Sequence, residues 1–198
     1  MAGDLILLAA ALASTLLMYR QPADMAEEQR LRLSTSRLAL VFIAAAALGR
    51  LTLNAASQDT ETLRRMLDNL ALYAALPLLA TAVLGQALNW HWSRAGWGRW
   101  LLGLFALFEL CRRMELGELY TLCLGAAIGL ALLLAAVRLC EGWAPRLAAA
   151  ASGLLLAAAI CTPGLPLPQP PALALAIAQA AALPLVAFTL LSRSRPPQ

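Results

Sequence analysis

The feature that most constrains this chain is a succession of apolar runs, each long enough or nearly long enough to cross a lipid bilayer. Seven such runs fill most of the 198 residues, and only short polar connections separate them. A helix that is apolar on every side needs lipid, or the interior of a large protein, around it. The sequence therefore predicts an all-α fold, a polytopic transmembrane helix bundle.

The predicted crossings cover residues 5–19, 38–56, 70–88, 97–111, 119–136, 147–162 and 172–191. Six crossings is the alternative, because the run 97–111 is short and ends among charged residues. The first run follows Asp4 instead of the positive residues that open a signal peptide, so we expect it to be retained, with cleavage near Ala13 as the alternative. No connection is long enough for a second folded unit, so residues 1–198 are expected to form a single membrane domain.

The arginines predict how the bundle sits in the membrane. Seven crossings with the N-terminus outside place ten of the fifteen arginines on the cytoplasmic side and five on the other. This imbalance favours an N-out/C-in orientation, since positive residues near helix ends stay in the cytoplasm. The net charge of +4 is then explained by arginines at helix ends, where they contact lipid headgroups, and no nucleic-acid partner is expected. The absence of lysine in an Ala- and Leu-rich chain favours a high-GC bacterial genome, hence the bacterial inner (plasma) membrane.

A short string recurs in two predicted crossings. Residues 74–78 and 181–185 both read Ala-Ala-Leu-Pro-Leu, and the same offset places the second predicted crossing on the sixth. With seven crossings, the two units run in the same direction, which predicts the three-plus-one-plus-three plan of parallel-repeat transporters. This likeness concerns topology alone and does not establish a function.

Small residues recur at four-residue spacing in the last three crossings. Gly125 and Gly129 form a G-x-x-x-G pair, and similar stripes are Ala149, Gly153, Ala157 and Ala174, Ala178, Ala182. Small residues at this spacing let helix backbones approach closely, which favours a tight bundle or a homo-oligomer. Before the third crossing, Asp59 or Thr60 is expected to cap an amphipathic segment that extends the crossing or lies on the membrane surface.

Charged residues close to apolar runs form one candidate functional cluster. Glu109 follows an apolar stretch, and Arg112 and Arg113 at positions i+3 and i+4 are spaced to pair with it. An ionisable group at the edge of hydrocarbon is costly unless it is paired, so local pairing competes with proton or substrate handling. Arg50 and Asp68 are predicted to lie on the same side of the membrane as possible partners.

Aromatic residues after the third crossing form a second candidate cluster, at the membrane interface. Four of the five tryptophans fall within one short stretch, where indole rings anchor a chain at headgroup level. A lipid-headgroup or quinone-edge site is the sharper alternative. The residues of this cluster are Trp90, His91, Trp92, Arg94, Trp97, Arg99 and Trp100.

The residues that bind metals or cofactors are sparse. His91 is the only histidine, which argues against haem with two histidine ligands and against multi-histidine zinc sites. Cys111, Cys123, Cys140 and Cys161 lack the C-x-x-C spacing of redox or zinc sites. We therefore expect no metal, no cofactor and no catalytic residue of a known motif.

Three functions remain open on the sequence. The first, which the sequence favours over the two alternatives, is a non-enzymatic membrane component, an accessory, assembly or interaction subunit that binds membrane lipids and a membrane-protein partner or a second copy of itself. The second is a small transporter of a neutral or lipophilic solute, favoured by the repeat and by Pro77 and Pro184, which free backbone carbonyls within helices. The third is a membrane-embedded lipid-modifying enzyme that uses Glu109 or Asp68 with His91.

Overall fold

Every regular element in the described part of the chain is a helix. The computed structural model describes residues 1–19, 26–53, 57–138, 142–165 and 170–192. Helices suit this composition because they pair their backbone groups internally, as lipid requires. The elements are α1 (Ala2–Tyr19), α2 (Glu27–Thr52), α3 (Gln58–Leu70), the π-helical turn η1 (Ala71–Ala75), α4 (Leu76–Ala87), α5 (Arg94–Arg113), α6 (Gly117–Arg138), α7 (Trp143–Cys161), the 3-10 turn η2 (Thr162–Gly164) and α8 (Ala172–Ser192).

Six helices within the described residues are long and apolar enough to cross a bilayer. They are α1, α2, the continuous helix of 30 residues that α3, η1 and α4 form, α6, the helix that α7 extends into η2, and α8. The prediction of a polytopic all-α bundle is therefore confirmed, and the chain is a multi-pass membrane protein. The segment α5 is not among the six, because charged residues stand near both of its ends.

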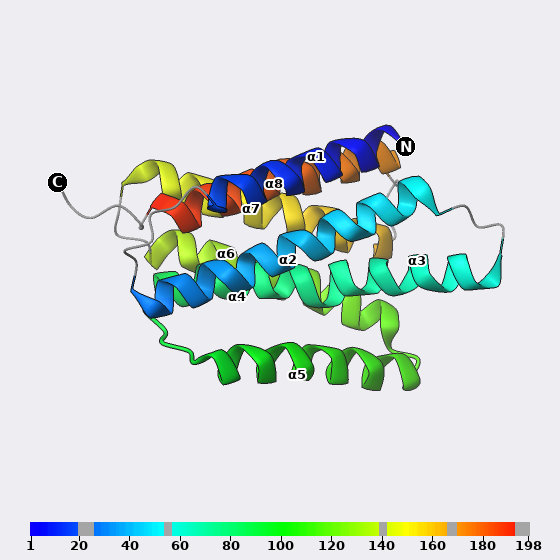
Figure 1. Cartoon of the computed structure of the whole chain (residues 1–198), viewed down its shortest axis with the longest axis horizontal. Coiled ribbons are helices and arrows are strands. Elements are labelled where there is room, and N and C mark those ends of the chain that lie inside the picture. Colours follow the sequence, from blue (N-terminus) through cyan, green and yellow to red (C-terminus); the bar gives the residue numbers. More distant parts are fainter. Residues whose placement is uncertain (20–25, 54–56, 139–141, 166–169, 193–198) are drawn as a thin grey trace.

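The helix α5 nevertheless carries the chain from one end of the bundle to the other. Successive helices alternate in direction, so that α4 ends at one end and α6 begins at the opposite end (Figure 1). The 20 residues of α5 span about 30 Å, which matches the hydrocarbon thickness. The start of α1 and the end of α8 therefore lie at opposite ends, as seven crossings require. We call the end where α2, α5 and α7 begin the arginine-rich end.

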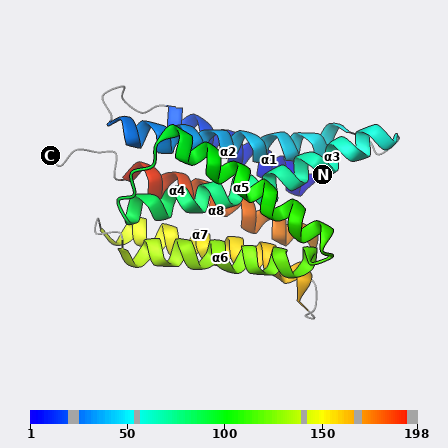
Figure 2. The same cartoon turned by 90° about the horizontal axis from the view of Figure 1, so that it is seen from below.

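Helix contacts within the bundle agree with a three-plus-one-plus-three plan. Helix α1 packs on α2 and α8, and α6 correspondingly packs on α7 and α4. Helix α2 packs on η1 and α4 as α7 packs on α8. The contacts among α1, α2 and α4 thus correspond, one by one, to the contacts among α6, α7 and α8. Helix α5 belongs to neither set and lies on the periphery of the bundle (Figures 1 and 2).

The small-residue stripes predicted in α6 and α7 meet one another inside the chain. A Cβ atom added at Gly129 would lie 2.8 Å from Ala157 Cβ and 3.3 Å from the Gly153 carbonyl oxygen. Gly153 similarly approaches the Leu132 side chain, and Gly125 approaches Ile160 and Cys161. This close approach makes α6 and α7 one of the tightest pairs in the bundle, through van der Waals contact.

Several predicted boundaries need correction. Helix α2 begins at Glu27 instead of residue 38 and ends at Thr52. The predicted start was too late because it followed the apolar run, whereas the polar turns before that run are also helical. Residues 54–56 of the predicted second crossing lie outside the described residues. Ser57, and not Asp59 or Thr60, caps α3, since its hydroxyl accepts the Thr60 N–H while the Thr60 hydroxyl accepts the Ser57 N–H. The amphipathic segment is a helical extension of the third crossing.

Replacement of Gly129 by alanine is expected to lower stability. The added methyl group has no free space between α6 and α7, and overpacking of this kind costs about 1–3 kcal/mol. Gly103→Ala is the matched control, because an added Cβ meets nothing within 4 Å on α5. Thermal unfolding in mild detergent should give a lower melting temperature for Gly129→Ala alone. Equal melting temperatures for the two variants would contradict the packing described here.

The seven-helix order predicts that the two chain ends lie on opposite sides of the membrane. An N-terminal epitope should be removed by protease added outside bacterial spheroplasts, and green fluorescent protein fused to the C-terminus should fluoresce in the cytoplasm. Six crossings would place both ends on one side. Protection of the epitope together with a fluorescent C-terminus would therefore show that α5 does not cross.

Candidate functional site

A bridge of opposite charges joins three helices at the end of the bundle away from the arginine-rich end. Arg50, near the end of α2, donates from Nε to Asp68 Oδ1 of α3 at 2.7 Å and from Nη1 to Asp4 Oδ1 of α1 at 3.3 Å. The three side chains are only 21–35% exposed. Pairing lowers the cost of keeping these charges near hydrocarbon. We call Asp4, Arg50 and Asp68 the charge bridge.

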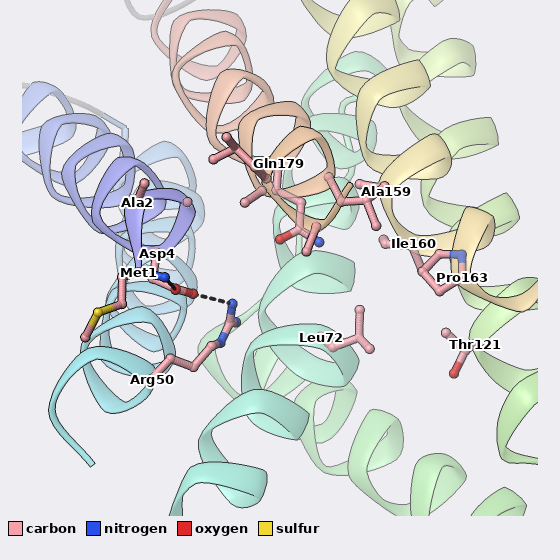
Figure 3. A pocket seen from close by; sticks show the side chains of 15 residues that line it. Met1, Ala2, Asp4, Arg50, Leu72, Thr121, Ala159, Ile160, Pro163 and Gln179 are labelled. Atoms are coloured by element: carbon pink, nitrogen blue, oxygen red, sulfur yellow. Dashed lines mark hydrogen bonds and ion pairs between the residues drawn. The ribbon is translucent and has the colours of Figure 1, made fainter. Parts of the chain in front are cut away.

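A cavity of about 560 Å³ lies beside the charge bridge, between the two three-helix units (Figure 3). Arg50 and Leu72 come from the first unit, while Thr121 of α6 and Gln179 of α8 come from the second. A deeper cavity of about 170 Å³ shares Arg50, Leu72 and Gln179 and also touches Asp68. Most of the remaining lining is alkyl, and it includes Ala159, Ile160, Pro163, Ala172 and Ala176.

The π-helical turn η1 forms part of the wall of these cavities. The Leu76 N–H bonds to the Ala71 carbonyl, five residues back, in place of the usual four. Pro77 has no N–H to offer the carbonyl of Tyr73, so the ladder is already broken at this point. Ala71 and Leu72 of this turn line the cavities. Single π turns of this kind occur frequently at functional sites.

The predicted polar cluster separates into two groups. Arg50 and Asp68 come together, as described above. Glu109 instead pairs within α5, because it accepts two hydrogen bonds from Arg112 at 2.8 Å and one from Arg113 at 3.0 Å. All three side chains are exposed, so this second group has the geometry of local surface pairing.

The predicted interface cluster also divides. Trp92 contacts three other indole rings, with centroid distances of 6.0 Å to Trp90, 5.1 Å to Trp97 and 6.0 Å to Trp100. His91 lies away from this stack, since its Nε2 is 3.0 Å from Glu28 Oε2 at the start of α2. The side chains of Arg94 and Arg99 are exposed beside the tryptophans.

His91 cannot share a site with Glu109 or Asp68. It follows α4, whereas Asp68 lies about 30 Å away along the same helix, near the opposite end of the bundle. Within the described ranges, no three His, Cys, Asp or Glu residues lie together as metal ligands would. Cys111, Cys123 and Cys161 are free thiols, and Cys140 lies outside the described residues.

Asp4 is the site residue that sequence reasoning missed. Asp4 entered the sequence analysis only as evidence that the first crossing is retained. It lies far from Arg50 in the sequence, so no spacing rule predicts that the two residues pair. Gln179 also escaped notice, because one polar residue in an Ala-rich helix has no distinguishing pattern. Both residues are brought to the cavity by the packing of α1 against α8.

Comparison with known proteins places this chain in no family. No protein-family model matches it, and neither does any curated protein or solved structure.

The Arg50–Asp68 pair is expected to stabilise the fold more than a surface pair does. A double-mutant cycle with Arg50→Gln and Asp68→Asn should give a coupling free energy of about 1 kcal/mol, measured by unfolding in mixed micelles. The control cycle uses Arg65→Gln and Glu61→Gln, an i,i+4 pair on one helix whose arginine is exposed, where about 0.3–0.5 kcal/mol is usual. A coupling no larger than the control would show that the bridge does not hold α2 against α3.

Proposed function

We propose that this chain is a small transporter of the bacterial inner membrane, and that its solute occupies the cavity beside the charge bridge. The observation that carries the proposal is that both three-helix units contribute to this cavity. In transporters built from repeats, the solute binds at the interface between the repeats, where one unit can move against the other. The π-helical turn, which directly precedes Pro77 in the helix, supplies irregular backbone in the wall of this cavity.

The lining indicates a neutral solute with a mainly apolar skeleton. Alkyl side chains form most of the wall, and Gln179 offers an amide group. The Thr121 hydroxyl already donates to the Gly117 carbonyl and bonds to the Tyr73 hydroxyl. Arg50 is already compensated by Asp4 and Asp68, so it does not act as a free cation for an anionic solute. A small molecule with one or two hydroxyl, carbonyl or amide groups fits these surroundings.

The distribution of arginine supports the direction in which the cavity faces. The positive-inside rule places the arginine-rich end in the cytoplasm. The charge bridge and the cavity lie at the opposite end, so they would face the outside. In this orientation the solute would enter from the external side. The location in a bacterial inner membrane is part of the proposal and rests on the arginine and alanine bias of the sequence.

The other two functions have less support from the geometry. The small-residue faces of α6 and α7, which had favoured binding of another subunit, pack on each other within the chain. The residues considered for an enzyme, Glu109, Asp68 and His91, lie in three separate places. A transporter accounts for both the cavity and the repeated helix contacts.

Transport is tested by reconstitution into liposomes with a panel of labelled neutral solutes. At least one apolar alcohol, ketone or amide should enter with saturable kinetics, faster than into protein-free liposomes. Gln179→Phe should lower this uptake about tenfold, because the ring projects into the cavity and the amide is lost, a change that corresponds to about 1.4 kcal/mol.

Ile177→Phe is the matched control on the same helix. Ile177 is 46% exposed and does not line the cavity, so uptake should be unchanged. Equal melting temperatures of the two variants would exclude misfolding as the cause of a difference. Uptake at the protein-free rate for every solute, with correctly inserted wild-type protein, would refute the proposal.

A further inference from the structure

A third, strongly apolar cavity of about 600 Å³ lies between α4, α5 and α6. On α5 it is lined by Trp100, Leu104 and Leu107, and on α6 it extends from Tyr120 to Ala131. Its length along α6 is about 16 Å, close to the thickness of one leaflet of hydrocarbon. We call this cavity the α5 groove.

The groove exists because α5 packs loosely on the rest of the bundle. Trp97 and Leu104 are its only buried residues among those described, and α5 passes obliquely across α4 and α6 (Figure 2). An unfilled space of this size would forfeit dispersion contacts along all its walls. In a bilayer, the material available to fill it is lipid chain.

One end of the groove is at headgroup level. Trp90, Trp92 and Trp100 line that end, and the Trp100 indole N–H donates to Thr81 Oγ1 at 3.2 Å. Indole rings of membrane proteins gather at the interface between hydrocarbon and water. The groove therefore begins at the interface of the arginine-rich end and runs into the hydrocarbon.

Unpaired positive charge stands at the same end. Arg94 is two residues from Trp92, and Arg99 is adjacent to Trp100. Both side chains are exposed, and neither has a hydrogen bond or ion pair to any residue that the structure describes. Arginine forms charge-assisted hydrogen bonds with phosphate oxygens, so these two side chains complement an anionic headgroup.

We propose that the α5 groove holds one anionic phospholipid from the leaflet at the arginine-rich end. One acyl chain lies between α5 and α6, while Arg94 and Arg99 bind the headgroup phosphate. The lipid completes the packing of α5, and this role is independent of the solute cavity at the opposite end.

Native mass spectrometry of the protein purified from a bacterial membrane in mild detergent tests this proposal. The wild type should retain one phosphatidylglycerol or cardiolipin in preference to phosphatidylethanolamine. Arg94→Gln with Arg99→Gln should reduce that preference about tenfold, the factor that corresponds to 1.4 kcal/mol. Arg64→Gln with Arg65→Gln, at the opposite end, should leave it unchanged.

Substitutions within α6 separate the chain site from general lipid contact. Ala127 lines the groove, whereas Ala126 is an exposed neighbour that does not. Ala127→Phe should abolish the retained lipid and Ala126→Phe should keep it. The proposal would be overturned by a wild type that retains no lipid, by equal retention of phosphatidylethanolamine, or by equal retention in the two phenylalanine variants.

Discussion

The pairing of Arg50 with two carboxylates joins three helices at one end of the bundle. A guanidinium at the edge of hydrocarbon must find an opposite charge or reach water, and Arg50 finds Asp68 on α3 and Asp4 on α1. These contacts hold the ends of α1, α2 and α3 together at one end of the bundle. The same contacts leave a cavity beside them, because the charged side chains pair with one another instead of filling the space toward Gln179.

Packing differs strongly among the helices, and this difference explains where the cavities lie. Gly125, Gly129 and Gly153 bring α6 and α7 into close contact, so little space remains between them. The π-helical turn before Pro77 interrupts the regular hydrogen bonding of its helix, and the cavity beside the charge bridge lies against this turn. Helix α5 has charged ends and few buried residues, which leaves the lipid-sized groove beneath it.

The class of fold and much of the helix order were predictable, because long apolar runs have one physical solution in lipid. The pairing of Arg50 with Asp68 was also within reach, since both belong to the same side in a seven-helix order. Asp4, Gln179 and the π turn were not, because they depend on how α1 and α8 pack and on how the helix adjusts around Pro77. The prediction that Glu109 lies near Arg50 rested only on their expected position on the same side of the membrane. Glu109 instead pairs with Arg112 and Arg113 on the peripheral helix α5.

If the cavity beside the charge bridge receives a solute from outside the cell, water must reach it from that side. In a cysteine-free variant, Gln179→Cys and Ile177→Cys can be treated with a membrane-impermeant thiol reagent added from outside intact cells. Gln179 lines the cavity, and Ile177 lies two residues away on the exposed surface of α8, where we expect lipid to cover it. We predict rapid labelling at position 179 and little at position 177. No labelling at position 179, or equal labelling at both, would contradict the account.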